Sequence, residues 1–233
     1  MEAIPRTFKL LWLIKKGFEV HNMGNHQVLF LFSEESNADK VLVGEPWLFN
    51  KYLFALKRIW RQMEMKGLEF DNAHFWIQVH DLPFGSLNMR VARDIVSTAG
   101  EVINRGAESE DYEGNNFMQV RVKIDVTKPL CRGRKIGLSN GEESWVSFKY
   151  ERMPNLCYWC GCLTHYDKEC SIWLKRKGTL RKNDQQFGLW LRANTPNLAR
   201  KTVICVVGYK EEVREIMGLS RIRRGVMKGV LKF

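Results

Sequence analysis

Four side chains that can bind a metal lie close together in the sequence: Cys157, Cys160, His165 and Cys170. Their spacing is C-x2-C-x4-H-x4-C, so two tight turns can bring all four donors around one ion. Three thiolates and one neutral imidazole form a soft-to-borderline ligand set that suits zinc in a closed tetrahedral site. The spacing therefore predicts one structural Zn²⁺, and the alternative is a chance cluster of cysteines.

No catalytic group accompanies this predicted site. Four protein ligands leave no coordination position for a substrate or a water molecule. His80 and Asp81 are neighbours in the sequence, but neighbouring strand residues point to opposite faces and do not form a ready dyad. The sequence also offers no phosphate-binding loop and no carboxylate pair. We therefore expect a binding protein and not an enzyme.

The positive charge of the chain is concentrated after the predicted metal site. Residues 1–170 balance 22 Lys and Arg against 22 Asp and Glu, whereas residues 171–233 carry 15 against 4. The second stretch thus accounts for the whole net charge of +11. Such a basic segment predicts a polyanionic partner, most often nucleic acid; an anionic membrane surface and a merely solubilising tail are the alternatives.

The sequence gives no sign of secretion or of membrane insertion. The early apolar run at residues 8–14 is short and contains Lys9, and no run approaches the roughly 18 residues of a spanning helix. Three cysteines remain outside the predicted site: Cys131, Cys162 and Cys205. An odd remainder argues against a disulfide framework. We expect an intracellular protein, nuclear or cytoplasmic and not secreted, with no membrane partner.

Residues 1–61 are predicted to form an incomplete α+β domain. The pattern indicates a helix carrying Phe8, Leu11 and Trp12, strands at 18–22 and 26–32, a helix capped by Ser33 and closed by Gly44, and a strand at 52–60. This order is βαββαβ without its first strand. Either the chain is shortened at its N-terminus or the missing strand comes from elsewhere.

Residues 73–152 are predicted to form a second, small α+β unit with a hairpin. Residues 117–126 alternate cleanly between apolar and polar side chains, which predicts a strand with one core face and one wet face. Arg121 and Lys123 are expected on the wet face, where they could contact phosphate or be ordinary surface residues. Residues 139–142, Ser-Asn-Gly-Glu, predict the turn of the hairpin that follows. The metal site at 153–172 and a basic segment at 173–233 complete the expected organisation.

Two further motifs flank the metal site. Pro46-Trp47-Leu48-Phe49 ends the first unit, and the stretch 187–193, Phe-Gly-Leu-Trp-Leu-Arg-Ala, follows the ligand cluster. Together with the ligand spacing they resemble plant proteins that carry a domain of unknown function followed by a CCHC zinc knuckle. These proteins are similar to the nucleic-acid-binding first open reading frame protein of plant LINE-type retrotransposons. The resemblance covers roughly residues 7–193.

The resemblance implies an RNA-recognition-like (ferredoxin-like) sandwich for the first domain. In that fold, aromatic residues on central strands can stack on bases, but we expect Phe30 and Phe32 to be core residues. The chain departs from the family in lacking the opening strand. It departs again at Thr164, because such knuckles commonly have glycine just before the histidine.

The resemblance also implies which residues touch nucleic acid. In knuckles of the retroviral type, the residues after the first cysteine and after the histidine form a platform for an unpaired base; here these are Tyr158 and Tyr166. The alternative is that one or both rings only pack the knuckle. Trp159 is expected to pack against the preceding domain. The cations near enough in sequence to contact phosphate around the platform are Arg152, Lys168, Lys175, Arg176 and Lys177.

Three hypotheses remain open at this point. The first is zinc-dependent binding of single-stranded nucleic acid, RNA in preference to DNA, with little sequence specificity. The second is a protein-interaction adaptor that uses the knuckle and the stretch around Trp190. The third is a decayed retroelement fragment without a selected role.

Overall fold

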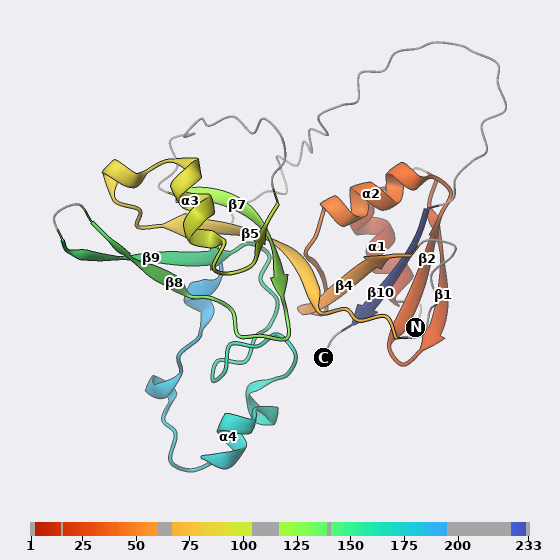
Figure 1. The fold of residues 1–233 in the computed structure, drawn as a ribbon. Coiled ribbons are helices and arrows are strands. Elements are labelled where there is room, and N and C mark those ends of the chain that lie inside the picture. Colours follow the sequence, from red (N-terminus) through yellow and green to blue (C-terminus); the bar gives the residue numbers. More distant parts are fainter. Residues whose placement is uncertain are drawn as a thin grey trace, which may run out of the picture.

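The protein contains two domains, each built on an antiparallel β-sheet, so its fold class is α+β (Figure 1). The computed structural model describes residues 3–14, 16–59, 67–103, 117–138 and 141–194, and the backbone of residues 225–231. An arm formed by residues 154–186 extends from the second domain and carries the short helix α4 (Ser171–Lys175). Among the described residues, no helix is long and apolar enough to cross a membrane.

The first domain packs two helices against a five-stranded sheet. Its strand order is β1-β2-β10-β4-β3. The elements are α1 (Ala3–Trp12), β1 (Phe18–Gly24), β2 (Gln27–Phe32), α2 (Glu35–Val43), β3 (Trp47–Phe49), β4 (Tyr52–Arg58) and β10 (Gly225–Leu231). The predicted helices and strands of residues 1–61 are present in the predicted order, and β3 is an additional strand that was not predicted. The predicted cap of α2 is wrong, because Glu34 and not Ser33 is the N-cap residue, and its side chain makes no capping hydrogen bond.

The middle strand of the first sheet comes from the far end of the chain. Strand β10 pairs antiparallel with β2 on one side and with β4 on the other. Gly225 lies opposite Phe32, and Leu231 lies opposite Phe54. A strand from outside residues 1–61 thus takes part in this sheet, and in Figure 1 β10 lies between β2 and β4.

An aromatic cluster holds α1 against this sheet. Phe8 and Trp12 lie one turn apart on the apolar face of α1, and their rings stack with centroids 4.7 Å apart. Both contact Phe30 of β2, edge-on, at 6.0 Å and 4.9 Å between centroids. Such edge-to-face contacts add to the free energy of burying aromatic surface. Phe30 and Phe32 are fully buried, so they are core residues as expected.

The second domain is a five-stranded sheet with one helix. Its strand order is β6-β7-β5-β9-β8. The elements are β5 (Asn72–His80), a 3₁₀ turn (Phe84–Ser86), α3 (Met89–Val96), β6 (Glu101–Val102), β7 (Phe117–Asp125), β8 (Gly133–Gly137) and β9 (Glu143–Tyr150). The Asn88 side chain begins α3 by accepting a hydrogen bond from Val91 N–H at 2.9 Å. The predicted strand and hairpin are both present.

The face of β7 that was expected to be wet is partly covered by the first domain. Arg121 is only 3% exposed, which corrects the expectation that its side chain faces solvent. It donates hydrogen bonds to the backbone carbonyls of Glu45 and, at 3.0 Å, of Val43, and its guanidinium lies over the Trp76 ring. The Glu45 carboxylate is buried and pairs with His74 Nδ1 at 2.5 Å. These contacts fasten the end of α2 to the second sheet.

The chain returns to the second domain after the arm. Phe187 and Leu191 are buried in the core of that domain, and Ala193 N–H donates to the Tyr150 carbonyl at 3.0 Å. The described part of the basic segment therefore includes a stretch that packs on the second sheet and a strand, β10, that lies in the first. Residues 195–224 and 232–233 lie outside the described residues.

Candidate metal centre and nucleic-acid interface

The four predicted ligands meet in the arm. One donor atom from each of Cys157, Cys160, His165 and Cys170 lies within 4.8 Å of every other. Zinc–sulfur bonds of about 2.3 Å in a tetrahedron place two sulfurs about 3.8 Å apart. Cys160 Sγ and His165 Nε2 are 3.3 Å apart, close to the roughly 3.6 Å that zinc–sulfur and zinc–nitrogen bonds imply. The donor set fits one structural zinc ion in type, number and spacing.

A tight turn carries the first two ligands. Gly161 N–H donates to the Cys157 carbonyl at 2.8 Å, and Cys157 N–H donates to the Cys162 carbonyl at 2.9 Å. Gly161 has φ +76°, a left-handed conformation that costs other residues about 1–2 kcal/mol. A Cβ at this position would also collide with the Phe187 ring. Gly161 therefore serves both the turn and the packing of the arm against the stretch that follows it.

The side chains of Asp167 and Thr164 support the part of the site around His165. Asp167 Oδ1 accepts a hydrogen bond from Tyr158 N–H at 2.6 Å, which ties the turn after His165 to the turn after Cys157. Thr164 Oγ1 lies 3.2 Å from His165 Nδ1. When Nε2 binds zinc, Nδ1 carries the proton and donates to this hydroxyl, which fixes the orientation of the ring. The residue that replaces the common glycine thus takes part in the site.

Ionisation of the thiols is coupled to metal binding. Burial raises the pKa of the Cys157 thiol, and it raises the pKa of Cys160 to about 11. Burial also opposes ionisation of Cys170, but hydrogen bonds from the Trp173 backbone and from His165 lower its pKa to about 7. Zinc must therefore displace protons from Cys157 and Cys160 at neutral pH.

Family comparisons match two parts of the chain. A model described as "Zinc knuckle" matches residues 124–172, and one described as "Domain of unknown function (DUF4283)" matches residues 1–66. The chain is thus similar to DUF4283 over its first 66 residues and to a zinc knuckle over residues 124–172. The zinc knuckle match begins well before the first ligand and includes the hairpin of β8 and β9, so the knuckle and that hairpin belong to one recognised unit. As a class, CCHC knuckles indicate zinc binding and nucleic-acid binding.

One curated relative is distantly similar to about half of the chain. The "Uncharacterized protein At4g02000" of Arabidopsis thaliana is 25% identical over 130 residues, which is 56% of this chain and 41% of the relative. The chain thus spans less than half of the length of that protein. No solved structure matches the chain.

The two tyrosines of the predicted platform have different surroundings. Tyr158 is half-buried and packs against the core of the second domain. Tyr166 is 41% exposed, and its ring meets the Tyr52 ring of the first domain edge-on, with centroids 5.2 Å apart. Sequence reasoning missed Tyr52, because nothing in the sequence indicates that β4 lies beside the knuckle. The exposed ring is therefore that of Tyr166, which lies against the partly buried Tyr52.

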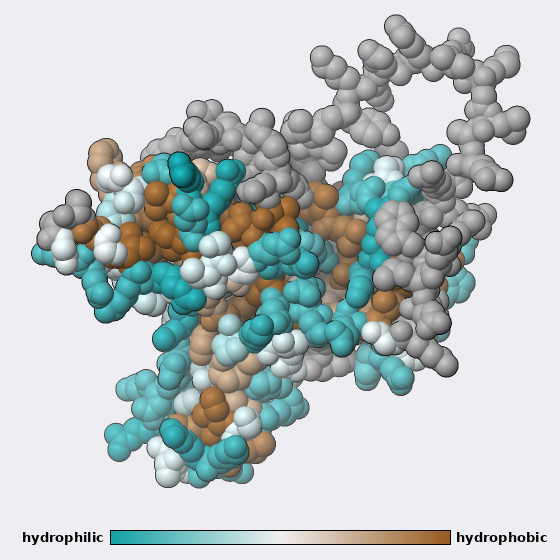
Figure 2. Space-filling view, in the orientation of Figure 1, coloured by the Kyte–Doolittle hydropathy of each residue, from teal (hydrophilic) through white to brown (hydrophobic). Residues whose placement is uncertain are grey.

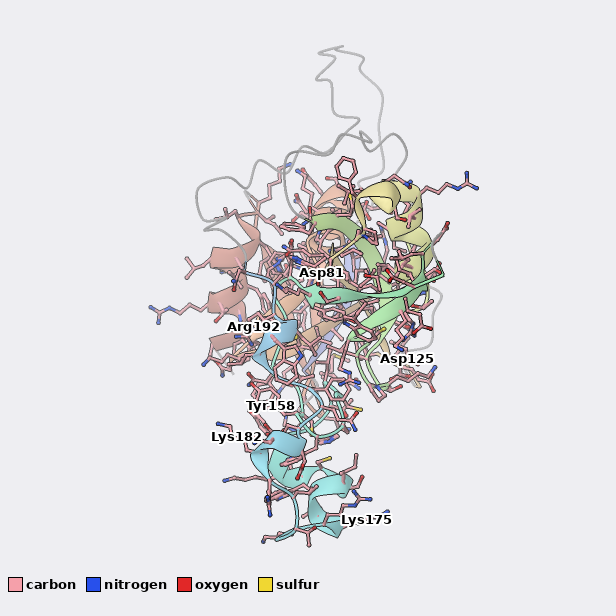
Figure 3. The ribbon with its side chains drawn as sticks, turned by 90° about the vertical axis from the view of Figure 1, so that its left-hand side faces the viewer. Asp81, Asp125, Tyr158, Lys175, Lys182 and Arg192 are labelled. Atoms are coloured by element: carbon pink, nitrogen blue, oxygen red, sulfur yellow. The ribbon has the colours of Figure 1, made fainter. Side chains whose placement is uncertain are left out.

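The predicted cations also divide into two groups. Lys168, Lys175, Arg176 and Lys177 are exposed on the knuckle arm. Arg152 is exposed as well, but it lies at the boundary between the domains, with its guanidinium over the Trp47 ring. Lys123 pairs with Glu101 at 3.2 Å on the second sheet, and Arg121 is buried. In Figure 3, Arg192, Tyr158, Lys182 and Lys175 follow one another from the second domain to the far end of the arm.

Trp159 does not pack against the preceding domain as expected. Its ring stacks on Trp173 at 5.3 Å, nearly parallel, beside the ligands Cys157 and Cys170. The two indoles form a small core for the knuckle itself, which has few other apolar residues to bury. Figure 2 shows hydrophilic residues over much of the arm and a hydrophobic spot near its tip. Two apolar residues of α4, Ile172 and Leu174, are exposed.

Proposed function

We propose that this protein is a zinc-dependent binder of single-stranded nucleic acid and not an enzyme. The observation that carries the proposal is the position of Tyr166, an exposed ring held beside a closed metal site on an arm rich in exposed cations. An exposed aromatic face accepts any base by stacking, with a free energy of about 1–3 kcal/mol per base. Little sequence specificity follows from this mode of binding.

The metal has a structural part in this proposal. A zinc ion with three thiolates carries a formal charge of about −1, so it does not attract phosphate by itself. Binding energy from the ion instead orders a segment that is too short to fold alone. The ordered turns then hold Tyr166 against Tyr52 and place Lys168 and the cations at 175–177 on one arm. Contacts from these cations to phosphate weaken with salt through counterion release.

The fold of the first domain belongs to the same proposal. We infer an RNA-recognition-like, ferredoxin-like sandwich in which β10 takes the place of the opening strand. Supporting observations are the antiparallel order β1-β2-β10-β4 and the aromatic core between the sheet and α1. Its aromatic residues Phe30 and Phe32 face that core, so stacking is assigned to the knuckle and not to this sheet.

Two finer statements rest on the resemblance to plant retroelement proteins. These are a preference for RNA over DNA and an origin from a LINE-type first open reading frame. A third, an intracellular setting, nuclear or cytoplasmic, rests on the odd number of cysteines outside the metal site. Competition between RNA and DNA oligomers of the same sequence tests the first of them.

Salt-dependent fluorescence anisotropy on an unstructured, labelled RNA tests the proposal. We expect affinity to fall steeply with salt, and Tyr166→Ala to weaken binding about 5- to 150-fold. Tyr166→Phe keeps the ring and is the matched control, so its affinity should stay near that of the unchanged protein. The proposal would be refuted if RNA affinity changed neither with salt concentration nor in the Tyr166→Ala variant. A protein partner that stays bound in high salt after nuclease treatment would favour the adaptor hypothesis instead.

A further inference from the structure

Two exposed tryptophans flank a hollow on the second domain, away from the zinc ligands. Trp145 of β9 is 48% exposed, and Trp190 of the returning stretch is 58% exposed. The hollow has a volume of about 440 Å³, within the range of about 300–1,000 Å³ typical of small-ligand clefts. Its lining consists of Arg132, Trp145, Ser147, Phe148, Lys149 and Trp190. We call this hollow the tryptophan cradle.

The strand period places these side chains on the open face of the sheet. Along β9, Val146, Phe148 and Tyr150 are buried in the core, so Trp145, Ser147 and Lys149 lie on the opposite face. Backbone pairing puts Gly133 of β8 directly opposite Ser147. An apolar ring on this face is not needed for the core, which lies on the other side of the sheet.

Each indole ring lies against a glycine. A Cβ at Gly133 would collide with the ring of Trp145, and a Cβ at Gly188 would collide with the ring of Trp190. Because neither glycine has a side chain, the two indole rings can pack directly against the backbone. Since each ring is covered on one side and remains about half exposed, it offers a planar aromatic surface to solvent. This arrangement suits stacking on a second planar group.

Cations surround the two rings. Arg132 is held in place by its hydrogen bond to the Gln186 carbonyl at 3.0 Å and by the Phe187 ring beneath its guanidinium. Lys149 lines the same hollow, and the described residues that line it include no carboxylate. An adjoining hollow shares Arg132 and Trp145 and adds Lys128, Arg134 and the carboxylate of Asp125, which pairs with Lys128 at 3.0 Å. A second carboxylate, that of Asp81, accepts a hydrogen bond from Ser147 of the cradle. Cations therefore outnumber carboxylates around the two rings.

The cradle also adjoins the knuckle. Phe187 packs on Gly161 of the knuckle and lies under Arg132 of the cradle. The cradle and the knuckle are therefore close enough for one bound molecule to contact both.

We propose that the tryptophan cradle is a second contact site for single-stranded nucleic acid. A base stacks on Trp145 or Trp190, and Arg132 and Lys149 contact the flanking phosphates. Planar rings set among cations fit a chain of planar bases joined by anionic links better than they fit an apolar peptide. The class of ligand rests on the proposed function, but the residues that bind it are separate from the zinc ligands and from Tyr166.

The test compares two oligomers of equal charge in anisotropy titrations of the full chain. One is a labelled oligouridine, and the other has the same backbone with its bases removed. Trp145→Leu and Trp190→Leu should each weaken binding of oligouridine about 5- to 150-fold and leave binding of the abasic oligomer nearly unchanged. Trp145→Phe should recover most of the affinity. Phe84→Leu, at an apolar residue that is 94% exposed on the same domain, is the matched control.

The outcomes separate the cradle from the knuckle. If both tryptophan variants bind oligouridine as the unchanged protein does while Tyr166→Ala binds weakly, the cradle proposal fails and the proposed function stands. If the unchanged protein binds neither oligomer, both fail. An equal loss for the two oligomers would show damage to the fold or to phosphate contacts and would overturn stacking. Binding of an uncharged, unstructured peptide that depends on Trp145, with oligouridine unaffected, would assign the hollow to a protein partner.

Discussion

Replacement of Thr164 by valine should weaken zinc binding without changing any zinc ligand. Valine keeps the size and branching of threonine but removes the hydroxyl that lies 3.2 Å from His165 Nδ1. Loss of a hydrogen-bonding partner for a metal-bound histidine typically lowers metal affinity about 10- to 100-fold. Here the partner is a neutral hydroxyl at a long distance, for which a net contribution of about 0.5–1.5 kcal/mol is usual. We therefore expect a loss of about three- to tenfold.

Competition with a chromophoric zinc chelator measures this affinity directly. Thr164→Ser restores a hydroxyl at the same position and is the matched control, so its zinc affinity should lie close to that of the unchanged protein. The reasoning is refuted if Thr164→Val binds zinc as tightly as the unchanged protein does. It is also refuted if Thr164→Ser loses as much as Thr164→Val, since the hydroxyl would then not be the cause.

Three other predictions follow from buried or strained residues. Arg121→Met should lower the free energy of unfolding in urea by about 2–4 kcal/mol, because two backbone carbonyls of the first domain lose a charged donor. The control Lys123→Met, on the same strand but in a partly exposed ion pair, should lower it by at most about 1 kcal/mol. Equal effects of the two variants would contradict the contact of Arg121 with the end of α2. Gly161→Ala should destabilise the zinc-bound protein by at least about 1–2 kcal/mol, measured in the same way, and unchanged stability would show that the turn does not need glycine. Because burial raises the pKa of Cys157 and Cys160, both thiols are protonated at neutral pH. Zinc binding then releases two protons, so zinc affinity should fall about a hundredfold as pH decreases from 8 to 7, about tenfold for each proton. Zinc affinity that does not change with pH in the chelator assay would show that the thiols are already ionised.

The sequence predicted those parts of the structure that depend on local pattern. The ligand spacing identified the metal cluster, and strict alternation identified β7 and the core position of Val120 and Val122. Both signals arise within a few residues of chain, where turns and strand geometry leave little freedom. The aromatic face of β2 was assigned to the core because that strand lacks the glycine and basic residues of the usual RNA-binding motif.

Contacts between distant segments could not be predicted in this way. Alternation marks the two faces of β7 but not what covers each face, so Arg121 was placed in solvent although the end of α2 lies over it. Trp159 was assigned to the wrong neighbour because its partner, Trp173, lies beyond the fourth zinc ligand. Strand β10 pairs with residues almost 200 positions away, and no periodicity within one segment reports such a pairing. Trp145 was passed over although a signal was present: it shares its face of the strand with Ser147 and Lys149, and polar neighbours mark that face as the exposed one.

Zinc content and RNA affinity measured on one purified sample, before and after removal of the metal, test the central claim most directly. The account predicts one zinc ion per chain, salt-sensitive binding of an unstructured RNA, loss of most of that affinity on treatment with a strong chelator, and recovery when zinc is restored. RNA binding that is unchanged after complete removal of zinc, with the rest of the protein still folded, would contradict it.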